Sequence, residues 1–123
     1  MQVTENFGTN QHLISAYGKG YIKVNKQEYR QNLILTPAKI IKNWCDCGPE
    51  ALEVEHFSPL DSSDLELIIL GTGSRLVFPP PPLMQYFLHK RIGFEVMDLG
   101  AACRTYNVLL SEGRQVAAAL LLA

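Results

Sequence analysis

The second half of the sequence alternates between short apolar runs and segments with helical spacing. Residues 67–70 are continuously apolar, as expected for a strand covered on both faces of a sheet. Similar runs follow at residues 94–98 and 116–122. The segments between them are long enough to form crossover helices. The pattern predicts a βαβαβ unit, whose two crossovers should be right-handed and give parallel strands.

Two helices are predicted between these strands. The prolines at residues 79–82 favour an extended loop that ends at a helix start, where proline is tolerated. Leu83, Phe87, Leu88 and Ile92 have helical spacing, and Gly93 is expected to end this first helix. The second helix should begin at an Asp98 cap, stop at Gly113 and bury a stripe of apolar residues: Leu99, Ala102, Cys103, Tyr106, Leu109 and Leu110.

The first half of the chain is rich in β patterns. Gly18-Lys19-Gly20 predicts a hairpin turn between strand-like runs at residues 13–17 and 21–25. Three further strands are expected, at residues 28–35, 39–44 and 54–57. Residues 1–11 are polar and aperiodic, which predicts a flexible terminus. The whole chain, residues 1–123, is therefore expected to form a single α/β domain.

Composition restricts the classes of function. A net charge of -1 argues against nucleic-acid binding, which needs a basic surplus to neutralise phosphates. Three cysteines are too few for a secreted disulfide framework and indicate a reducing compartment. The N-terminus has no signal-peptide pattern, and the apolar runs are shorter than the ~20 residues of a membrane span. These features predict a cytoplasmic protein.

The turn after residues 67–70 is the main candidate site. Ligands of open α/β sheets bind beyond the carboxyl ends of the strands, where this turn and the start of the helix after Asp98 both lie. Backbone N–H groups at both places attract anions, and Arg75 and Arg104 would add positive charge. The candidate ligand-binding residues are Gly71, Thr72, Gly73, Ser74, Arg75, Asp98 and Arg104. The alternative is a tight turn with no ligand, because the third glycine of a dinucleotide motif and the lysine of a phosphate loop are missing.

The remaining reactive residues favour structural roles. Cys45 and Cys47 lack the spacing of a redox pair, and Cys103, His56 and His89 lack the spacing of zinc ligands. We therefore expect no metal site, no cofactor and no catalytic residues, with thiol or metal chemistry at the two neighbouring cysteines as the minor alternative. The proline run is interpreted as a rigid spacer, with recognition by an aromatic groove as its alternative.

Several separated segments resemble one known family. They are ILGTG at residues 69–73, FPP at 78–80, GFEVM at 93–97 and AACRTYNVL at 101–109. In this order they resemble a small α/β domain of unknown function, first described from an archaeal hypothetical protein. The domain also occurs in mitochondrial complex I assembly factor three and in a human adipogenesis-associated protein. The resemblance implies three layers: a central mixed sheet with additional N-terminal β-hairpin structure on one side and helices on the other.

The resemblance also implies a function. The mitochondrial member acts by binding other assembly proteins, and the family brings no established catalytic residues. This chain shows no mitochondrial targeting extension. The leading hypothesis is a non-catalytic binding or assembly-helper domain with protein partners. A small-molecule or anion-binding protein, or a weak enzyme, that uses residues 71–75 is the alternative. Homo-oligomerisation stays open.

Overall fold

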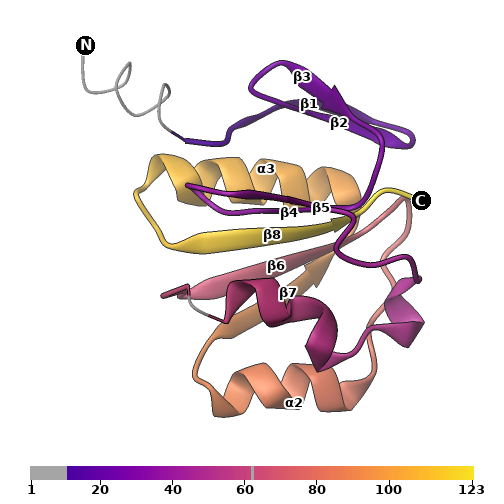
Figure 1. The fold of residues 1–123 in the computed structure, drawn as a ribbon, viewed down its shortest axis with the longest axis vertical. Helices are drawn as coiled ribbons and strands as arrows, with labels where there is room; N and C mark the ends of the chain where they lie inside the picture. The colour runs from indigo at the N-terminus through magenta and orange to yellow at the C-terminus, as the bar shows by residue number, and fades with distance from the viewer. Residues whose placement is uncertain (1–10, 62) are drawn as a thin grey trace.

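The computed structural model describes residues 11–61 and 63–123, so nearly all of the segment predicted to be a flexible terminus lies outside the described residues. Figure 1 shows two sheets and the helices around them. The strands are β1 (Ile14–Gly18), β2 (Tyr21–Val24), β3 (Gln27–Tyr29), β4 (Leu33–Leu35), β5 (Ile40–Lys42), β6 (Leu67–Thr72), β7 (Gly93–Met97) and β8 (Val116–Leu121). The helices are the 3₁₀ helices η1 (Pro49–Ala51) and η2 (Val54–Leu60) and the α-helices α2 (Pro81–His89) and α3 (Leu99–Ser111).

The central sheet is mixed and has the strand order β5-β4-β8-β6-β7. β6 pairs in parallel with β7 and with β8, whereas β4 is antiparallel to both β5 and β8. Every residue of β8 is buried, as expected for a strand packed on both faces. The predicted α/β class, mixed sheet and C-terminal βαβαβ unit are confirmed.

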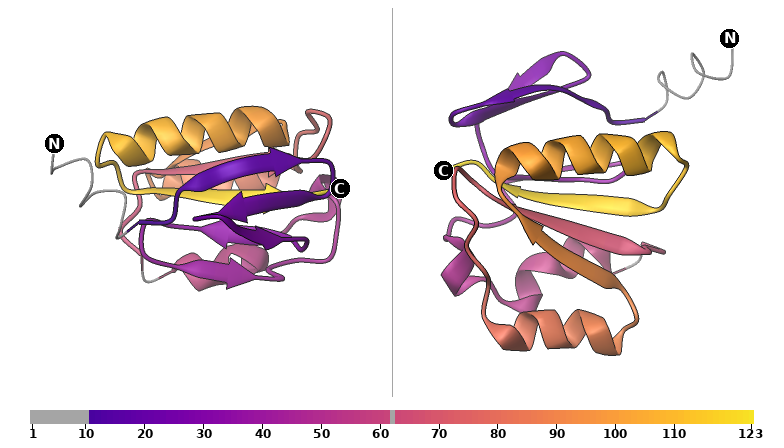
Figure 2. Two further views of the ribbon diagram at one scale, coloured as in Figure 1. Left: turned by 90° about the horizontal axis from the view of Figure 1, so that it is seen from above. Right: turned by 180° about the vertical axis from the view of Figure 1, so that it is seen from behind.

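The two faces of this sheet carry different layers. α3 and the three-stranded sheet β1-β2-β3 cover one face, and α2 and η2 cover the other (Figures 1 and 2). β7 and β8 lie on opposite sides of β6, so two right-handed crossovers must pass over opposite faces. α3 therefore shares its face with the additional β structure, which differs from the layering that the resemblance implied.

The expected strand at residues 28–35 was wrong, because the chain divides it between two sheets. β3 pairs with β2, whereas β4 belongs to the central sheet. Asn32 anchors the break: its Nδ2 donates to the Cys45 carbonyl at 3.1 Å, and its Oδ1 accepts from the Leu122 N–H at 2.9 Å. The break consists of the polar residues Arg30, Gln31 and Asn32, which the sequence analysis interpreted as part of one continuous strand.

The expected edge strand at residues 54–57 was also wrong. This segment is the start of η2, and Glu53 and His56 form a capping box at its N-terminus. The Glu53 N–H donates to His56 Nδ1 at 2.9 Å. Phe57 and Leu60 are buried at a spacing of three, which matches the period of a 3₁₀ helix.

The helix boundaries agree with the sequence at α3 and differ at α2. Asp98 caps α3, and Gly113 follows its end with φ 77°. Gly93 does not end α2, because it is already the first residue of β7, and Arg91 takes the left-handed conformation with φ 61°. Leu88 shares the helical spacing of the apolar residues in this segment, but its side chain is 73% exposed.

Replacement of Tyr106 by phenylalanine is expected to raise the free energy of unfolding by about 1 kcal/mol. Tyr106 is fully buried, its hydroxyl has no hydrogen-bond partner among residues 11–61 and 63–123, and burial raises the pKa of its phenol. The mutation removes this polar group and keeps the ring. Urea denaturation of the two proteins tests the expectation, and a loss of stability in the variant would contradict it. Tyr106→Leu is the control, and it should destabilise because it leaves a cavity.

Candidate binding site at the carboxyl rim of the sheet

The carboxyl ends of β6 and β7 meet at one rim, as the sequence predicted. The Leu99 N–H donates to the Gly73 carbonyl at 2.8 Å, so the turn after β6 touches the start of α3. The Thr72 hydroxyl lies 3.3 Å from the Met97 carbonyl. These contacts bring the 71–75 turn and Asp98 together.

Three residues of the predicted site hold this rim in shape. The Thr72 hydroxyl donates to the Arg75 carbonyl at 2.6 Å and accepts from the Val77 N–H at 3.1 Å, so it closes the turn. A Cβ on Gly71 would lie 2.9 Å from the Ala102 Cβ, so glycine lets α3 approach the sheet. Gly73 has φ 78°, and its backbone lies against the carbonyl of Ala123. These residues carry out packing and turn formation.

A groove of about 640 Å³ lies between this rim and the β1–β2 turn. The rim contributes Gly73 and Ser74 from the turn and Asp98 and Leu99 from the start of α3. The opposite wall is the hairpin turn, and the segment after β8 completes the lining, which includes Tyr17, Lys19, Gly20, Leu122 and Ala123. The structure therefore places Gly73, Ser74 and Asp98 of the predicted residues in one groove, which we call the rim groove.

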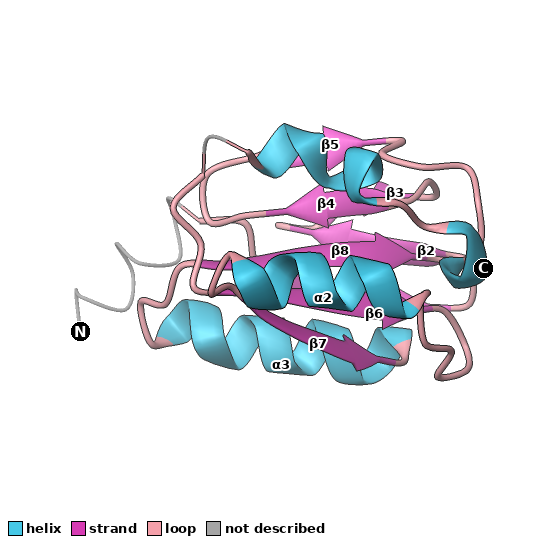
Figure 3. Ribbon diagram, turned by 90° about the horizontal axis from the view of Figure 1, so that it is seen from below, coloured by secondary structure: helices cyan, strands magenta, loops and turns pink. Residues whose placement is uncertain are grey.

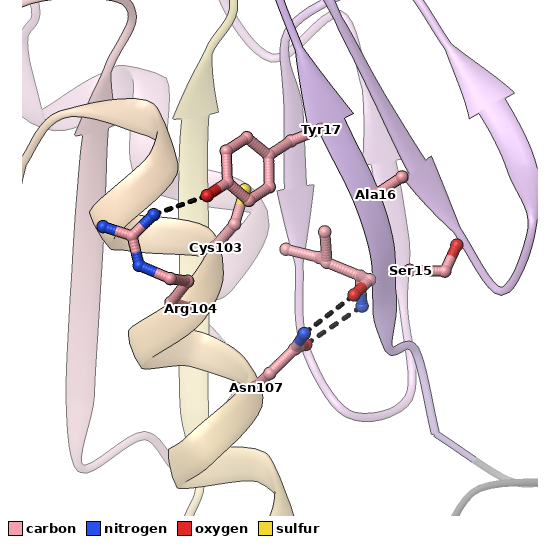
Figure 4. Close-up of a pocket in the computed structure, with 7 residues that line it drawn as sticks. Ser15, Ala16, Tyr17, Cys103, Arg104 and Asn107 are labelled. Carbon is pink, nitrogen blue, oxygen red and sulfur yellow. Dashed lines mark hydrogen bonds between the residues drawn. The ribbon is translucent and has the colours of Figure 1, made fainter.

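The two arginines of the predicted site do not face the rim groove. Arg75 is exposed and outside its lining. Arg104 donates a hydrogen bond to the Tyr17 hydroxyl, and its guanidinium carbon lies 6.0 Å from the centroid of that ring. Figure 4 shows this pair at a neighbouring pocket of about 390 Å³ between β1 and α3. Arg104 thus holds the hairpin against α3.

Asn107 makes the second attachment between β1 and α3. Its Oδ1 accepts from the Ile14 N–H at 3.0 Å, and its Nδ2 donates to the Ile14 carbonyl at 2.7 Å (Figure 4). On this side of β1, the Asn107 amide thus supplies the two backbone hydrogen bonds that a neighbouring strand would otherwise make with Ile14. Together with Arg104, it fixes the hairpin turn above the rim.

The start of α3 is poorly suited to a bound anion. The Asp98 carboxylate accepts the Ala101 N–H at 2.8 Å, and the Asp98 carbonyl accepts the Ala102 N–H at 2.9 Å. The Leu99 N–H is bonded to the Gly73 carbonyl. Three of the first four amides of the helix, at residues 99, 101 and 102, therefore already have hydrogen-bond partners. The carboxylate already provides the negative charge that a helix N-terminus attracts. Lys19 supplies one positive charge to the groove, which balances Asp98.

Replacement of Asp98 by alanine is expected to reduce the free energy of unfolding by about 1 kcal/mol, because α3 loses its N-cap. Asp98→Asn keeps an acceptor at the same position and should lose only a few tenths of that value. Urea denaturation at neutral pH compares the three proteins. Equal losses in both variants would contradict a capping role for this side chain.

The cysteines are separate from the rim groove. Burial raises the pKa of the Cys45 thiol to about 11 and that of Cys103 to about 12, so both are protonated at neutral pH. Cys47 is partly exposed, and its Sγ lies 3.9 Å from His56 Nε2. In residues 11–61 and 63–123, no three His, Cys, Asp or Glu side chains are grouped to hold a metal ion.

Sequence reasoning missed the half of the rim groove that comes from the hairpin. Tyr17, Gly18, Lys19 and Gly20 are about 80 residues from Asp98 in the sequence, and the glycines indicated only a turn. In the structure, Gly100 is the sequence feature that relates to this wall, because a Cβ at this position would lie 3.1 Å from the Tyr17 ring. A glycine in the first turn of a helix therefore marked the close approach of another segment.

This geometry defines a class of protein: a small α/β domain with a hairpin-walled groove at the carboxyl rim of its parallel strands. The chain belongs to the family described as "Protein of unknown function (DUF498/DUF598)", whose sequence profile matches residues 14–121. The resemblance found in the sequence motifs is therefore confirmed at the level of the family.

Similar proteins carry different names. A crystal structure of a Bordetella parapertussis protein is 32% identical, covers 92% of this chain and 97% of its own, and superposes with a TM-score of 0.85. The "NADH dehydrogenase [ubiquinone] 1 alpha subcomplex assembly factor 3" of Xenopus tropicalis is 33% identical over 81 residues, which are 66% of this chain and 43% of that factor. This chain thus spans less than half the length of the assembly factor.

A third relative has a name that concerns membranes. The "13 kDa major membrane protein" of Francisella tularensis subsp. holarctica is 27% identical over 101 residues, which are 81% of this chain and 82% of that protein. Among the described residues of this chain, no helix has both the length and the apolar composition to span a bilayer.

Proposed function

We propose that this protein is a non-catalytic binding domain that helps other proteins assemble, and that the rim groove is its contact surface. The observation that carries the proposal is the groove itself, which combines a fixed hairpin wall with one positive and one negative side chain. Its volume of about 640 Å³ accommodates a few side chains of a partner. The relatives named as assembly factors support the same kind of role.

The loop that leaves the groove adds apolar contact area. Leu76 and Phe78 follow the 71–75 turn, and their side chains are 53% and 61% exposed. Neither residue lines the groove, but both follow the groove-lining Ser74 closely in the sequence. Large exposed apolar side chains are typical of protein–protein interfaces, where aromatic residues carry much of the binding energy. We assign Phe78 as the main anchor of this contact.

Site-specific photo-crosslinking tests the proposal. A benzophenone side chain is placed at Lys19 or Ser74, on the two walls of the groove, and at exposed Glu112, beyond the other end of α3, as the control. In native cells, both groove positions should crosslink the same partner, and Glu112 should not. Phe78→Ala should reduce this crosslink with an unchanged melting temperature. Equal crosslinking from all three positions would contradict the assignment of the groove.

A small ligand in the rim groove is the second candidate function. The volume of the groove lies in the range of ~300–1,000 Å³ that is usual for ligand pockets. NMR titrations with phosphate, nucleotides and short carboxylates test this function. Amide shifts confined to Gly73, Leu99 and Gly100 would favour the ligand, and unchanged spectra would remove it. Turnover of a metabolite that depends on Arg75 or Arg104 would overturn the non-catalytic proposal.

We further propose a cytoplasmic protein whose partners are proteins rather than nucleic acids. The net charge of -1 supports this, because it leaves no basic surplus for a phosphate backbone. The proposal also takes residues 1–123 as one domain that needs no cofactor. Cell fractionation and a nucleic-acid retardation assay provide direct tests.

A further inference from the structure

The outer edge of β7 carries backbone groups that have no partner within the described part of the chain. β7 is the last strand of the central sheet and pairs with β6 alone (Figure 3). The Gly93 N–H donates to the Glu66 carbonyl at 2.9 Å, so Gly93 directs its backbone groups toward β6. Successive residues of a strand point to opposite sides in the ladder. Phe94 and Val96 therefore direct two N–H and two C=O groups outward.

This edge differs from the other edge of the same sheet. β5 has three residues, ends in Lys42 and is followed by Asn43 with φ 55°, so it is short, charged and bent away. Such features protect a sheet edge from pairing. β7 has five residues and alternates apolar Phe94 and Val96 with Glu95. Its length and alternation make it the edge that accepts another strand.

An apolar groove runs along this edge on the side of α2. It has a volume of about 260 Å³ and is lined by Met84, Leu88, Ile92 and Phe94, among others. The side chain of Leu88 is 73% exposed. A strand docked on β7 would direct every second side chain into this groove. The groove therefore favours apolar residues at those positions.

The charge of Glu95 determines which residue the docked strand favours between its two apolar positions. Glu95 is exposed on the face of β7 opposite to Phe94 and Val96. The residue directly opposite Glu95 in an antiparallel neighbour would have its Cβ roughly 5 Å from the Glu95 Cβ, and opposite charges stabilise such a pair. The edge thus selects the pattern apolar–basic–apolar.

A second copy of this chain does not fit the pattern. Twofold antiparallel pairing that uses all four outward groups places Phe94 opposite Val96 of the copy and Glu95 opposite Glu95 of the copy, where like charges repel. A shift in one direction requires Ile92, whose N–H already donates to the Phe87 carbonyl at 3.0 Å. A shift in the other requires Asp98, whose carbonyl already accepts the Ala102 N–H.

We propose that the β7 edge binds an extended segment of a partner protein as a sixth, antiparallel strand, with apolar side chains on both sides of a Lys or Arg that faces Glu95. The interaction goes beyond the proposed function because it uses the sheet edge and not the rim groove. Main-chain hydrogen bonds would supply affinity, and Glu95 together with the Leu88 groove would supply specificity.

A short peptide tests the proposal. The probe is acetyl-Ser-Thr-Val-Lys-Val-Thr-Ser-amide, compared with a version that carries Glu in place of Lys and one that is N-methylated at both valines. The lysine peptide should shift the amide signals of Phe94 and Val96 and slow their hydrogen exchange. It should bind about fivefold more tightly than the glutamate peptide, which corresponds to a charge-pair difference of about 1 kcal/mol. Methylation should abolish binding.

Charge reversal on the protein provides the matched control. Glu95→Lys should reverse the preference between the two peptides, whereas Glu112→Lys, which makes the same change at another exposed position, should leave it intact. Equal binding of the N-methylated peptide, or shifts confined to Gly73 and Gly100, would overturn the proposal. So would a concentration-dependent dimer that protects Phe94 and Val96 without peptide. The crosslinks from Lys19 and Ser74 test the rim groove independently of these outcomes.

Discussion

Replacement of Gly73 by valine is expected to lower the free energy of unfolding by about 3 kcal/mol and the melting temperature by about 10 °C. Gly73 has φ 78°, a conformation that costs a β-branched residue energy wherever it occurs. A Cβ at this position would also overlap the carbonyl of Ala123. The turn and the segment after β8 cannot both keep their positions, so strain and collision add.

Two further variants separate these causes. Gly113 has φ 77° and nothing within 4 Å of an added Cβ, so Gly113→Val measures the conformational strain alone. Cys47→Ser changes a partly exposed side chain and should have the smallest effect. We expect the Cys47→Ser protein to have the highest melting temperature of the three variants. The Gly113→Val protein should be intermediate, and the Gly73→Val protein should have the lowest melting temperature. Equal melting temperatures for the first and last of these proteins would refute the role of Gly73.

Replacement of Phe57 by alanine is expected to cost about 4 kcal/mol, with a fall in melting temperature of about 15 °C. Phe57 is 2% exposed and contacts three aromatic rings, those of Trp44 at 5.1 Å, Phe87 at 5.4 Å and Phe94 at 5.8 Å between centroids. The mutation would leave a cavity where η2, α2 and β7 meet. Differential scanning calorimetry provides the measurement.

The controls for Phe57 distinguish volume from ring contacts. Phe57→Leu fills most of the cavity and should lose less than half as much stability. Phe78→Ala removes the same atoms from a side chain that is 61% exposed and should leave the melting temperature nearly unchanged. A Phe57→Ala protein as stable as Phe78→Ala would mean that η2 does not belong to the core.

The parts of the fold predicted best are those in which local pattern and tertiary packing agree. β6 and β8 are apolar on both faces because both faces are covered, and α3 combines a capping Asp98, a regular apolar stripe and a stop at Gly113. Each of these signals lies within the element that it specifies. The crossover rule correctly predicted that these strands are parallel, but it did not predict their order in the sheet.

The errors arise where distant contacts override local preference. The β-rich residues 28–35 divide because Asn32 bonds to Cys45 and Leu122, which are remote in the sequence. η2 forms in a segment with strand-like composition because Phe57 completes an aromatic cluster with Trp44 and Phe87. The contacts of Asn32 and of Phe57 with these distant residues cannot be predicted from the local sequence of residues 28–35 or 54–60.

The candidate site was also predicted only in the part that follows from a local rule. The 71–75 turn and Asp98 were placed on one rim by the rule for parallel strands, and the structure brings Gly73, Ser74 and Asp98 together. The same rule says nothing of a hairpin from the other end of the chain. It therefore missed Tyr17 and Lys19 and assigned to the site an Arg104 that in fact holds that hairpin.

The position of β8 has a consequence for synthesis on the ribosome. β8 pairs with β4 on one side and with β6 on the other, so it joins the antiparallel part of the sheet to the parallel part. Before translation reaches Leu121, the nascent chain holds two unconnected partial sheets, each with an unpaired edge and exposed apolar faces. Commitment to the native topology is therefore delayed until β8 has been synthesised, and the apolar faces of the two partial sheets stay open to aggregation until then.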